Sequence, residues 1–342
     1  MNPERESAKI GPVSPSRLGT QPVGEVAEVA EGVHQLKVPI PIPLVYVSAY
    51  LVEGDDGWTL IDTGFDYGEG KAAWEAGARS LGFGLESDVS RIIVTHFHPD
   101  HLGAARWLQE TSGAPVYMLE SEIRNARAVW ENRDTSRFVE HLVRHGMDRE
   151  TTERATASMR TSLALPEKMV ALEEGEELPL GPGMARVVRA PGHADHQVVL
   201  HDEGRRILFA ADHVLLKITP NVGLWPETAP NPLLRYEESL RSMRDLPVEL
   251  VLPGHGPIFH DLRGRVDELL AHHEERLGEM LREVEDGPRT PFEVSRKVFR
   301  YGLSIYERCF ALAETLAHLD HLVLQGRAER VESEDLVRFR AS

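Results

Sequence analysis

The segment IIVTHFHPDHLGAA (Ile92–Ala105) places three histidines and an aspartate within six residues, directly after an apolar, β-branched run. Imidazole nitrogens and carboxylate oxygens at this density indicate metal binding or proton transfer. His96 and His98 are two residues apart, so in extended backbone they point the same way and one ion can bind both. Asp100 and His101 follow at the expected start of a helix and cannot easily face that same point. We therefore expect two neighbouring ions.

Further candidate ligands follow other predicted strands at the point where each strand ends. His193 comes after RVVRAPG, Asp212 after ILFAA and His255 after ELVLPG, just as His96 comes after RIIVT. Such strand-end loops are where α/β folds gather functional groups. A glycine directly precedes both His193 and His255, which permits turns that a Cβ would obstruct. Together these positions predict one shared site.

The candidate ligands divide into two sets joined by one carboxylate. The first ion would be held by His96, His98 and His193, the second by Asp100, His101 and His255, and the bridge would be Asp212. Nitrogen and oxygen donors of this kind suit Zn²⁺, and also Fe or Mn, so the residues alone do not choose the metal. We expect two divalent ions as cofactors, with zinc as the first choice.

The order of these motifs resembles that of a known family. THFHPDH (Thr95–His101) matches the H-x-H-x-D-H signature of the metallo-β-lactamase superfamily, and the later PGH, AADH and PGHG stretches follow in the family's order. LIDTG (Leu60–Gly64) resembles the strand-end motif found upstream of the signature. The resemblance covers Val26–His260 and implies an α/β fold, an αββα sandwich with a dinuclear site at one edge. The full ligand set is similar to that of glyoxalase II-like and lactonase-like hydrolases.

One stretch departs from the family pattern. After the PGH histidine the family commonly has Thr and, two residues further, Gly, whereas this chain has Ala194, Asp195 and His196. Metal binding by His193 should survive this change, but substrate identity does not carry over from the family. We expect Asp62 of the LIDTG motif, and His196, to contact the ligands rather than an ion. No substrate-binding residue is predicted.

Two such ions would activate water. A water between two divalent cations about 3.5–4 Å apart can have its pKa lowered from about 15.7 to about 7. The resulting hydroxide would attack a carbonyl carbon, while a metal stabilises the oxyanion. Asp100, besides binding an ion, would act as the catalytic residue that orients this nucleophile and takes its proton. A serine or cysteine nucleophile is not required, which agrees with the absence of a G-x-S-x-G motif.

Three functions remain under consideration. The first is hydrolysis of a small or mid-sized acyl substrate: a thioester, an ester or a lactone. The second is RNA processing, since some members of the family with a C-terminal winged-helix-like tail act on RNA. The formal charge of −17 and the pI of about 5.4 disfavour nucleic acid or an acidic membrane as a partner. The third is a binding or dimerisation role for the C-terminal helices, so assembly into a homo-oligomer is left open.

We expect three parts along the chain. Residues 1–25 are rich in Pro, Gly and Ser and predict a flexible tail, residues 26–261 the catalytic domain, and residues 262–342 a helical, winged-helix-like domain. Within the catalytic domain, residues 120–169 predict two or three inserted helices, which form either a peripheral layer or a cap over a substrate pocket. Without a signal-peptide or membrane-span pattern, we expect a cytoplasmic protein.

The histidines on charged or helical stretches are expected on solvated faces. They are His141, His145, His260, His272, His273, His318 and His321. Cys309, the single cysteine, is expected to be a small buried apolar residue.

Overall fold

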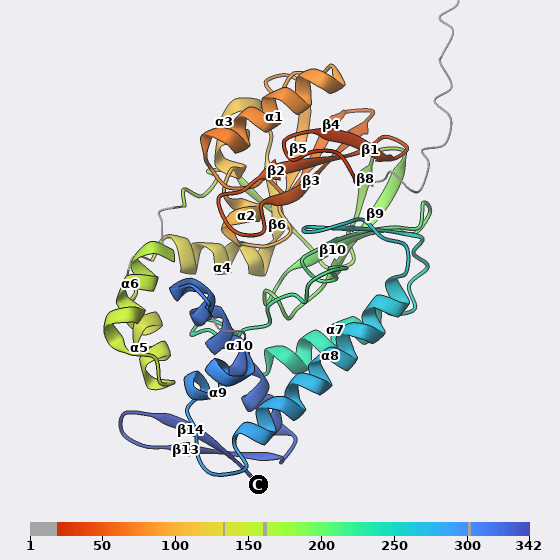
Figure 1. Cartoon of the computed structure of the whole chain (residues 1–342). Helices are drawn as coiled ribbons and strands as arrows, with labels where there is room; N and C mark the ends of the chain where they lie inside the picture. Colours follow the sequence, from red (N-terminus) through yellow and green to blue (C-terminus); the bar gives the residue numbers. More distant parts are fainter. Residues whose placement is uncertain (1–18, 133, 160–162, 300–301) are drawn as a thin grey trace, which may run out of the picture.

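The computed structural model describes residues 19–132, 134–159, 163–299 and 302–342. Among these residues the strands form a seven-stranded sheet, a five-stranded sheet and a two-stranded hairpin (Figure 1). The predicted flexible tail, residues 1–25, lies largely outside the described part. At its described end, the Gly24 N–H donates to the Lys37 carbonyl oxygen at 2.7 Å, so this end is attached to the first sheet.

The first sheet has its strands in chain order. The neighbours from β1 to β4 are antiparallel and those from β4 to β7 are parallel. The strands are β1 (Val26–Ala30), β2 (Val33–Pro39), β3 (Tyr46–Gly54), β4 (Gly57–Ile61), β5 (Val89–Ile93), β6 (Val116–Leu119) and β7 (Met169–Leu172).

The second sheet has the order β12-β11-β10-β9-β8. All neighbours are antiparallel except β11 and β12, which are parallel. The strands are β8 (Glu177–Leu180), β9 (Gly183–Arg189), β10 (Val198–Asp202), β11 (Ile207–Ala211) and β12 (Leu250–Pro253).

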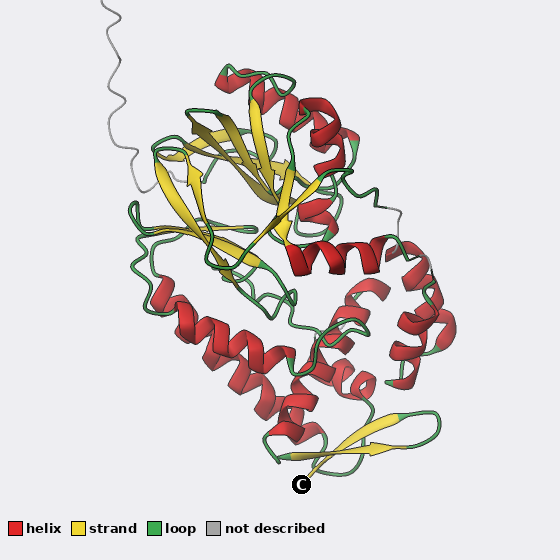
Figure 2. Cartoon of the chain, turned by 180° about the vertical axis from the view of Figure 1, so that it is seen from behind, coloured by secondary structure: helices red, strands yellow, loops and turns green. Residues whose placement is uncertain are grey.

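The two sheets pack face to face, and helices cover their outer faces (Figure 2). Because successive strand residues point to opposite faces, Ile61 and Ile93 contact the second sheet while Leu60 and Ile92 contact helices. The first sheet is covered by α1 (Gly68–Leu81), α2 (Pro99–Leu102), α3 (Ala105–Ser112) and α4 (Glu120–Trp130), the second by α7 (Pro232–Met243) and α8 (Leu262–Glu283). This confirms the αββα sandwich. Among the described residues, no helix has both the length and the apolar character that crossing a membrane requires.

The inserted segment between β6 and β7 contains α4, α5 (Ser136–Arg144) and α6 (Arg149–Met159) in its described part. The helix α4 packs on the first sheet, whereas α5 and α6 pack on α10 (Ile305–Leu324) of the C-terminal region. In that second contact, Phe138 and Leu142 lie against Leu312 and against Cys309, which is fully buried as expected. The insertion therefore connects the sandwich to the C-terminal helices.

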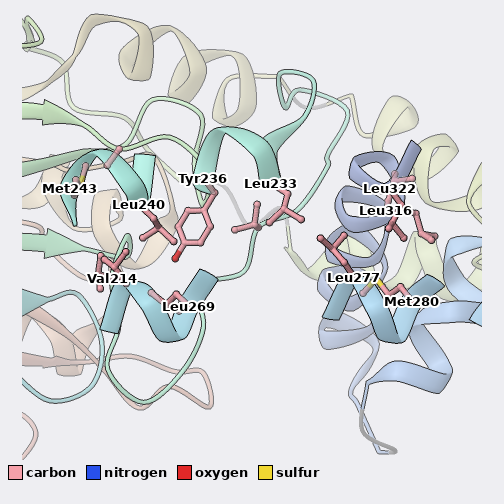
Figure 3. Close-up of a cluster of buried hydrophobic side chains, with 14 of the residues drawn as sticks. Val214, Leu233, Tyr236, Leu240, Met243, Leu269, Leu277, Met280, Leu316 and Leu322 are labelled. Carbon is pink, nitrogen blue, oxygen red and sulfur yellow. The ribbon is translucent and has the colours of Figure 1, made fainter. Parts of the chain in front are cut away.

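The C-terminal region consists of α8, α9 (Pro291–Val298), α10 and the hairpin β13 (Ala328–Glu332) and β14 (Val337–Ala341) in its described part, which agrees with the predicted helices and wing. Capping boxes at Thr290 and Ser304 begin α9 and α10. Leu277 of α8 and Leu316 of α10 belong to one hydrophobic cluster with α7 and the second sheet (Figure 3). The cluster continues across the predicted boundary between residues 261 and 262.

The prediction of solvated faces is wrong for four histidines. The buried ones are His145, His273, His318 and His321, with exposed fractions between 0% and 6%. They are buried because α8 and α10 contact each other and α7, while α5 covers another side of α10. His273 and His318 face each other across the α8–α10 contact, with Nδ1 and Nε2 3.0 Å apart. Helical spacing shows which residues share a face, but not whether another helix covers that face.

Candidate metal centre

The predicted ligands converge at one edge of the sandwich. His96 and His98 lie in the loop after β5, and Asp100 and His101 lie in the short helix α2 that follows it. The other three ligands come from the second sheet and follow β9, β11 and β12; they are His193, Asp212 and His255. Both sheets therefore contribute to the site.

The structure brings the seven side chains together as two groups. In the first group, His96, His98 and His193, each residue offers a nitrogen, and these atoms lie within 4.8 Å of one another. The second group consists of Asp100, His101, Asp212 and His255. One ligand atom from each of these residues likewise lies within 4.8 Å of the others. Asp212 Oδ2 lies 3.4 Å from the Nε2 atoms of His101 and His255 and 3.5 Å from that of His193. Asp212 therefore reaches both groups, as a bridging carboxylate must.

Atoms without partners show that the site fits cations. His96 Nε2, His101 Nε2 and Asp212 Oδ1 are buried and have no hydrogen-bond partner among the described residues. Leaving buried polar atoms unpaired is costly, and native structures rarely do so without an ion, a water or a functional reason. Nitrogen and carboxylate oxygen are the donors that zinc and similar divalent metals take. The residues present therefore fit two such ions.

The electrostatics of the two groups differ. In the first group, burial and the neighbouring His193 lower the pKa of His98 to about 3, so its lone pairs are available at neutral pH. In the second group, burial would lower the pKa of His255, but the carboxylates of Asp212 and Asp100 raise it to about 10. Two carboxylates thus hold positive charge in the second group even without a metal, because a proton on the imidazole can take the place of a cation.

Contacts behind the ligands fix the orientation of several rings. The Asp62 carboxylate lies 2.8 Å from His101 Nδ1 and also accepts the Thr95 N–H at 2.9 Å. His255 Nδ1 donates to the Tyr46 carbonyl oxygen, and His193 Nδ1 donates to the Asn221 carbonyl oxygen, each at 2.9 Å. Such partners set the tautomer and the direction of a ligating imidazole. Asp62 therefore contacts the candidate ligand His101, and its role in orienting a metal ligand stays a prediction.

His196 lies in a different environment. Its Nδ1 accepts a hydrogen bond from Arg189 Nη2 at 2.7 Å. The neighbouring Asp195, which departs from the family pattern, accepts the Ala229 N–H at 2.7 Å and pairs with Arg235 at 2.5 Å. Asp195 therefore holds the segment before α7, whereas His196 contacts Arg189 of β9. The structure records no contact between His196 and a candidate ligand side chain among the described residues.

Two glycines allow the ligand loops to approach closely. Gly192 has a φ of 138°, and a Cβ there would overlap the Tyr236 ring. A Cβ at Gly254 would overlap the carboxylate of Asp212 and come close to His101. Both positions therefore require glycine, for conformation and space at the first and for space at the second.

Several residues that hold the site could not be found from the sequence. Tyr46 and Asn221 act through backbone carbonyls, which every residue has. Glu122 accepts the Phe97 N–H at 2.8 Å, and the Trp130 indole donates to the Phe97 carbonyl at 2.9 Å. Both side chains lie on α4, and no motif marks them. Of the missed residues that hold the site, Thr95 alone could have been found from its sequence position, because it directly precedes His96. Its Oγ1 lies 3.0 Å from His96 Nδ1.

Comparisons with known proteins agree with this geometry. The family model of the metallo-β-lactamase superfamily matches residues 42–255, and a model named metallo-β-lactamase-like, C-terminal domain, matches residues 277–342. A crystal structure of a metallo-β-lactamase family protein from Thermus thermophilus is 34% identical, with a TM-score of 0.83, and the match covers 92% of this chain and 100% of that one.

Curated relatives include hydrolases. A probable metallo-hydrolase of Bacillus subtilis is 27% identical over 314 residues, which cover 85% of this chain and 92% of that protein. An atrochrysone carboxyl ACP thioesterase of Aspergillus fumigatus is 25% identical over 219 residues, which cover 63% of this chain and 54% of that protein.

Proposed function

Because this chain belongs to the metallo-β-lactamase superfamily, we propose that it is a dinuclear metal-dependent hydrolase of acyl substrates, with thioesters as the first class to test. The observation that carries the proposal is the position of Asp212, whose Oδ2 lies within 3.5 Å of imidazole nitrogens from both ligand groups. A carboxylate in that position can join two ions.

The chain's own residues would supply binding and proton transfer. Two bound divalent ions would supply a strong nucleophile from water at neutral pH and a Lewis acid for the developing oxyanion. His96, His98 and His193 would hold one ion, and the second group would hold the other. Asp100 would also accept the proton of the nucleophile on its carboxylate, whose Oδ2 lies 3.1 Å from His255 Nε2.

The thioester class is supported by two observations. One is the activity of the fungal relative, an acyl carrier protein (ACP) thioesterase. The other is the loop between β2 and β3, where Ile42, Leu44 and Val45 are 37% to 55% exposed. This loop leads into Tyr46, whose carbonyl holds His255, so exposed apolar side chains lie on the segment next to the centre. An acyl chain would cover such side chains from water.

The proposal is tested by metal analysis and a substrate screen on the full chain purified without chelator. We expect two divalent ions per chain, and hydrolysis of acyl thioesters that a chelator abolishes and added Zn²⁺ restores. The screen includes lactones, simple esters, a β-lactam and RNA, and His260→Ala, which changes an exposed histidine, serves as the control. A chain that takes up no metal, or hydrolysis that a chelator leaves intact, would refute the proposal. Cleavage of RNA with all acyl substrates inert would favour the nuclease alternative.

A further inference from the structure

The two ligand groups are held by different parts of the chain. In the second group, His101 contacts Asp62 at the end of β4, and His255 contacts the Tyr46 carbonyl at the start of β3. These supports belong to the first sheet. In the first group, Thr95 after β5 contacts His96, and the further supports come from helices that lie outside both sheets, α4 of the insertion and α10 of the C-terminal region.

We infer that α4 and α10 position the ion held by His96, His98 and His193, through Glu122 and Trp130 on one side and Glu314 on the other. The inference rests on the proposed function, because it assumes that an ion binds there. It gives the insertion and the C-terminal helices a shared role in the centre, namely control of one ion position and not of the other.

On the α4 side, the contact is with the residue between two ligands. The Phe97 N–H donates to Glu122 Oε1 at 2.8 Å, and the Phe97 carbonyl accepts from Trp130 Nε1 at 2.9 Å. His96 and His98 can face one ion only while the backbone between them keeps its present conformation. Glu122 is fully buried, so its hydrogen bond is shielded from competing water. Two side chains of one helix therefore fix the backbone that aims both ligands.

On the α10 side, the contact passes through Asn221. His193 Nδ1 donates to the Asn221 carbonyl at 2.9 Å, and Asn221 Nδ2 donates to Glu314 Oε2 at 2.8 Å. Asn221 Nδ2 also lies 3.5 Å from the Phe310 carbonyl oxygen, so a second acceptor of α10 faces this amide. The Leu224 N–H donates a hydrogen bond to the Ala313 carbonyl oxygen at 3.0 Å, which attaches the same loop to α10. Glu314 thus fixes the position of the Asn221 carbonyl, which orients the His193 ring.

The two glutamates allow a test that separates hydrogen bonding from charge. Burial raises the pKa of Glu122 to about 8 and that of Glu314 to about 7, so both side chains are neutral for much of the time near pH 7. Glutamine keeps the shape and the accepting oxygen, whereas alanine removes the acceptor of the Phe97 N–H at Glu122 and that of the Asn221 amide at Glu314. The Ala variants should therefore disturb the ion position and the Gln variants should restore it.

The experiment titrates metal-free full-length chain with Zn²⁺ by calorimetry and with Co²⁺ by absorption spectroscopy. For Glu122→Ala and Glu314→Ala we expect one of the two ions to bind about 10- to 100-fold more weakly and the other to bind as in wild type. In the Co²⁺ titration, the absorption spectrum of one bound ion should differ from that in the wild type, and the spectrum of the other ion should not. Glu122→Gln and Glu314→Gln should bind both ions nearly as wild type does. Glu120→Gln on α4 and Asp320→Asn on α10 are matched controls that should change neither affinity.

The outcomes distinguish this inference from the proposed function. If the wild type binds no metal, the proposed function fails and the inference fails with it. If the wild type binds two ions and the Ala variants weaken both equally or neither, the inference alone is overturned. Should Glu314→Ala not fold, Asn221→Asp replaces the donor to Glu314 by an acceptor on a part-exposed loop, and the same selective loss of one ion is expected. Unchanged binding in that variant would overturn the α10 half of the inference.

Discussion

His98 lies at the more open side of the metal centre. It is part-exposed, and its Nδ1 is 2.9 Å from His193 Nε2, so its main interactions are with the candidate ion site and not with the hydrophobic core. Replacing it removes a ligand at small cost in packing. Among the candidate ligands this makes His98 suitable for a test of function that leaves the fold in place.

We predict that His98→Ala loses the metal and the hydrolytic activity together while it stays folded. Activity should fall by more than about a hundredfold, since loss of a partner one contact further out already costs about 10- to 100-fold. Metal content, turnover and far-ultraviolet circular dichroism measured on one preparation check this. Unchanged turnover in the variant would exclude the proposed mechanism.

Gly254 is the second residue whose replacement is informative. A Cβ at this position would overlap the Asp212 carboxylate, which reaches both ligand groups. We predict that Gly254→Ala loses affinity for both ions, because the bridging carboxylate must move. Metal titration checks this, and Gly256→Ala, where a Cβ meets open space but the φ is 77°, controls for strain in the same loop. Full metal occupancy in Gly254→Ala would show that the loop can move away.

At the scale of elements, hydrogen bonds at the helix ends determine where the C-terminal helices begin. Ser304 accepts the Glu307 N–H, and Glu307 accepts the Ser304 N–H, so α10 begins with a reciprocal pair of hydrogen bonds. The helix α10 also contacts α5, α6, α7, α8 and α9. A weaker start of this helix should therefore lower the stability of a large part of the molecule.

We predict that Ser304→Ala lowers the free energy of unfolding by about 1 kcal/mol, the usual effect of losing a helix N-cap. Because Ser304 is distant in sequence from Glu314 and the cap satisfies only the first turn, metal affinity should change little. Urea unfolding followed by circular dichroism measures the first quantity and zinc titration the second. A variant as stable as the wild type would mean that water replaces the cap at no cost.

At the scale of the whole molecule, one hydrophobic cluster runs from the second sheet through α7 and α8 to α10 and the C-terminal hairpin. Buried imidazoles lie inside it, with His273 and His318 in contact and His318 Nδ1 donating to the Glu314 carbonyl at 2.8 Å. Burial lowers the pKa of His318 to about 3, against about 6.5 in an unfolded chain. Between about pH 3 and pH 6.5, His318 is therefore protonated in the unfolded chain but not in the folded chain.

The sign of the pH dependence follows from that difference. Below about pH 6.5 the unfolded chain binds more protons, so stability is present above this pH and is lost as the pH falls toward 3. We predict that His318 contributes a loss of up to about 1.4 kcal/mol per pH unit in this range. Denaturant unfolding of wild type and His318→Gln between pH 7 and pH 5 checks this, with a shallower decline expected for the variant. Parallel curves would show that His318 takes up no proton on unfolding.

The fold and the convergence of the candidate ligands were largely predictable. Strand-end positions of His96, His193, Asp212 and His255, together with the order of the motifs, indicated an αββα sandwich and two ligand groups, and the structure brings these residues together as expected. Their convergence could be predicted because candidate metal ligands are recognised by side-chain type and spacing, which are visible in a sequence; that they bind ions stays a prediction.

Only the tertiary structure decided what holds those ligands and what surrounds the helices. The supports at Tyr46 and Asn221 are backbone carbonyls, present at every position, and Glu122 and Glu314 become partners only because α4 and α10 pack where they do. The burial of His273 and His318 likewise depends on the contact between two helices. Side-chain chemistry and periodicity depend on residues that are close in the sequence, so they can be recognised there. Contacts between distant segments depend on how the helices and sheets pack, which no single stretch of sequence determines.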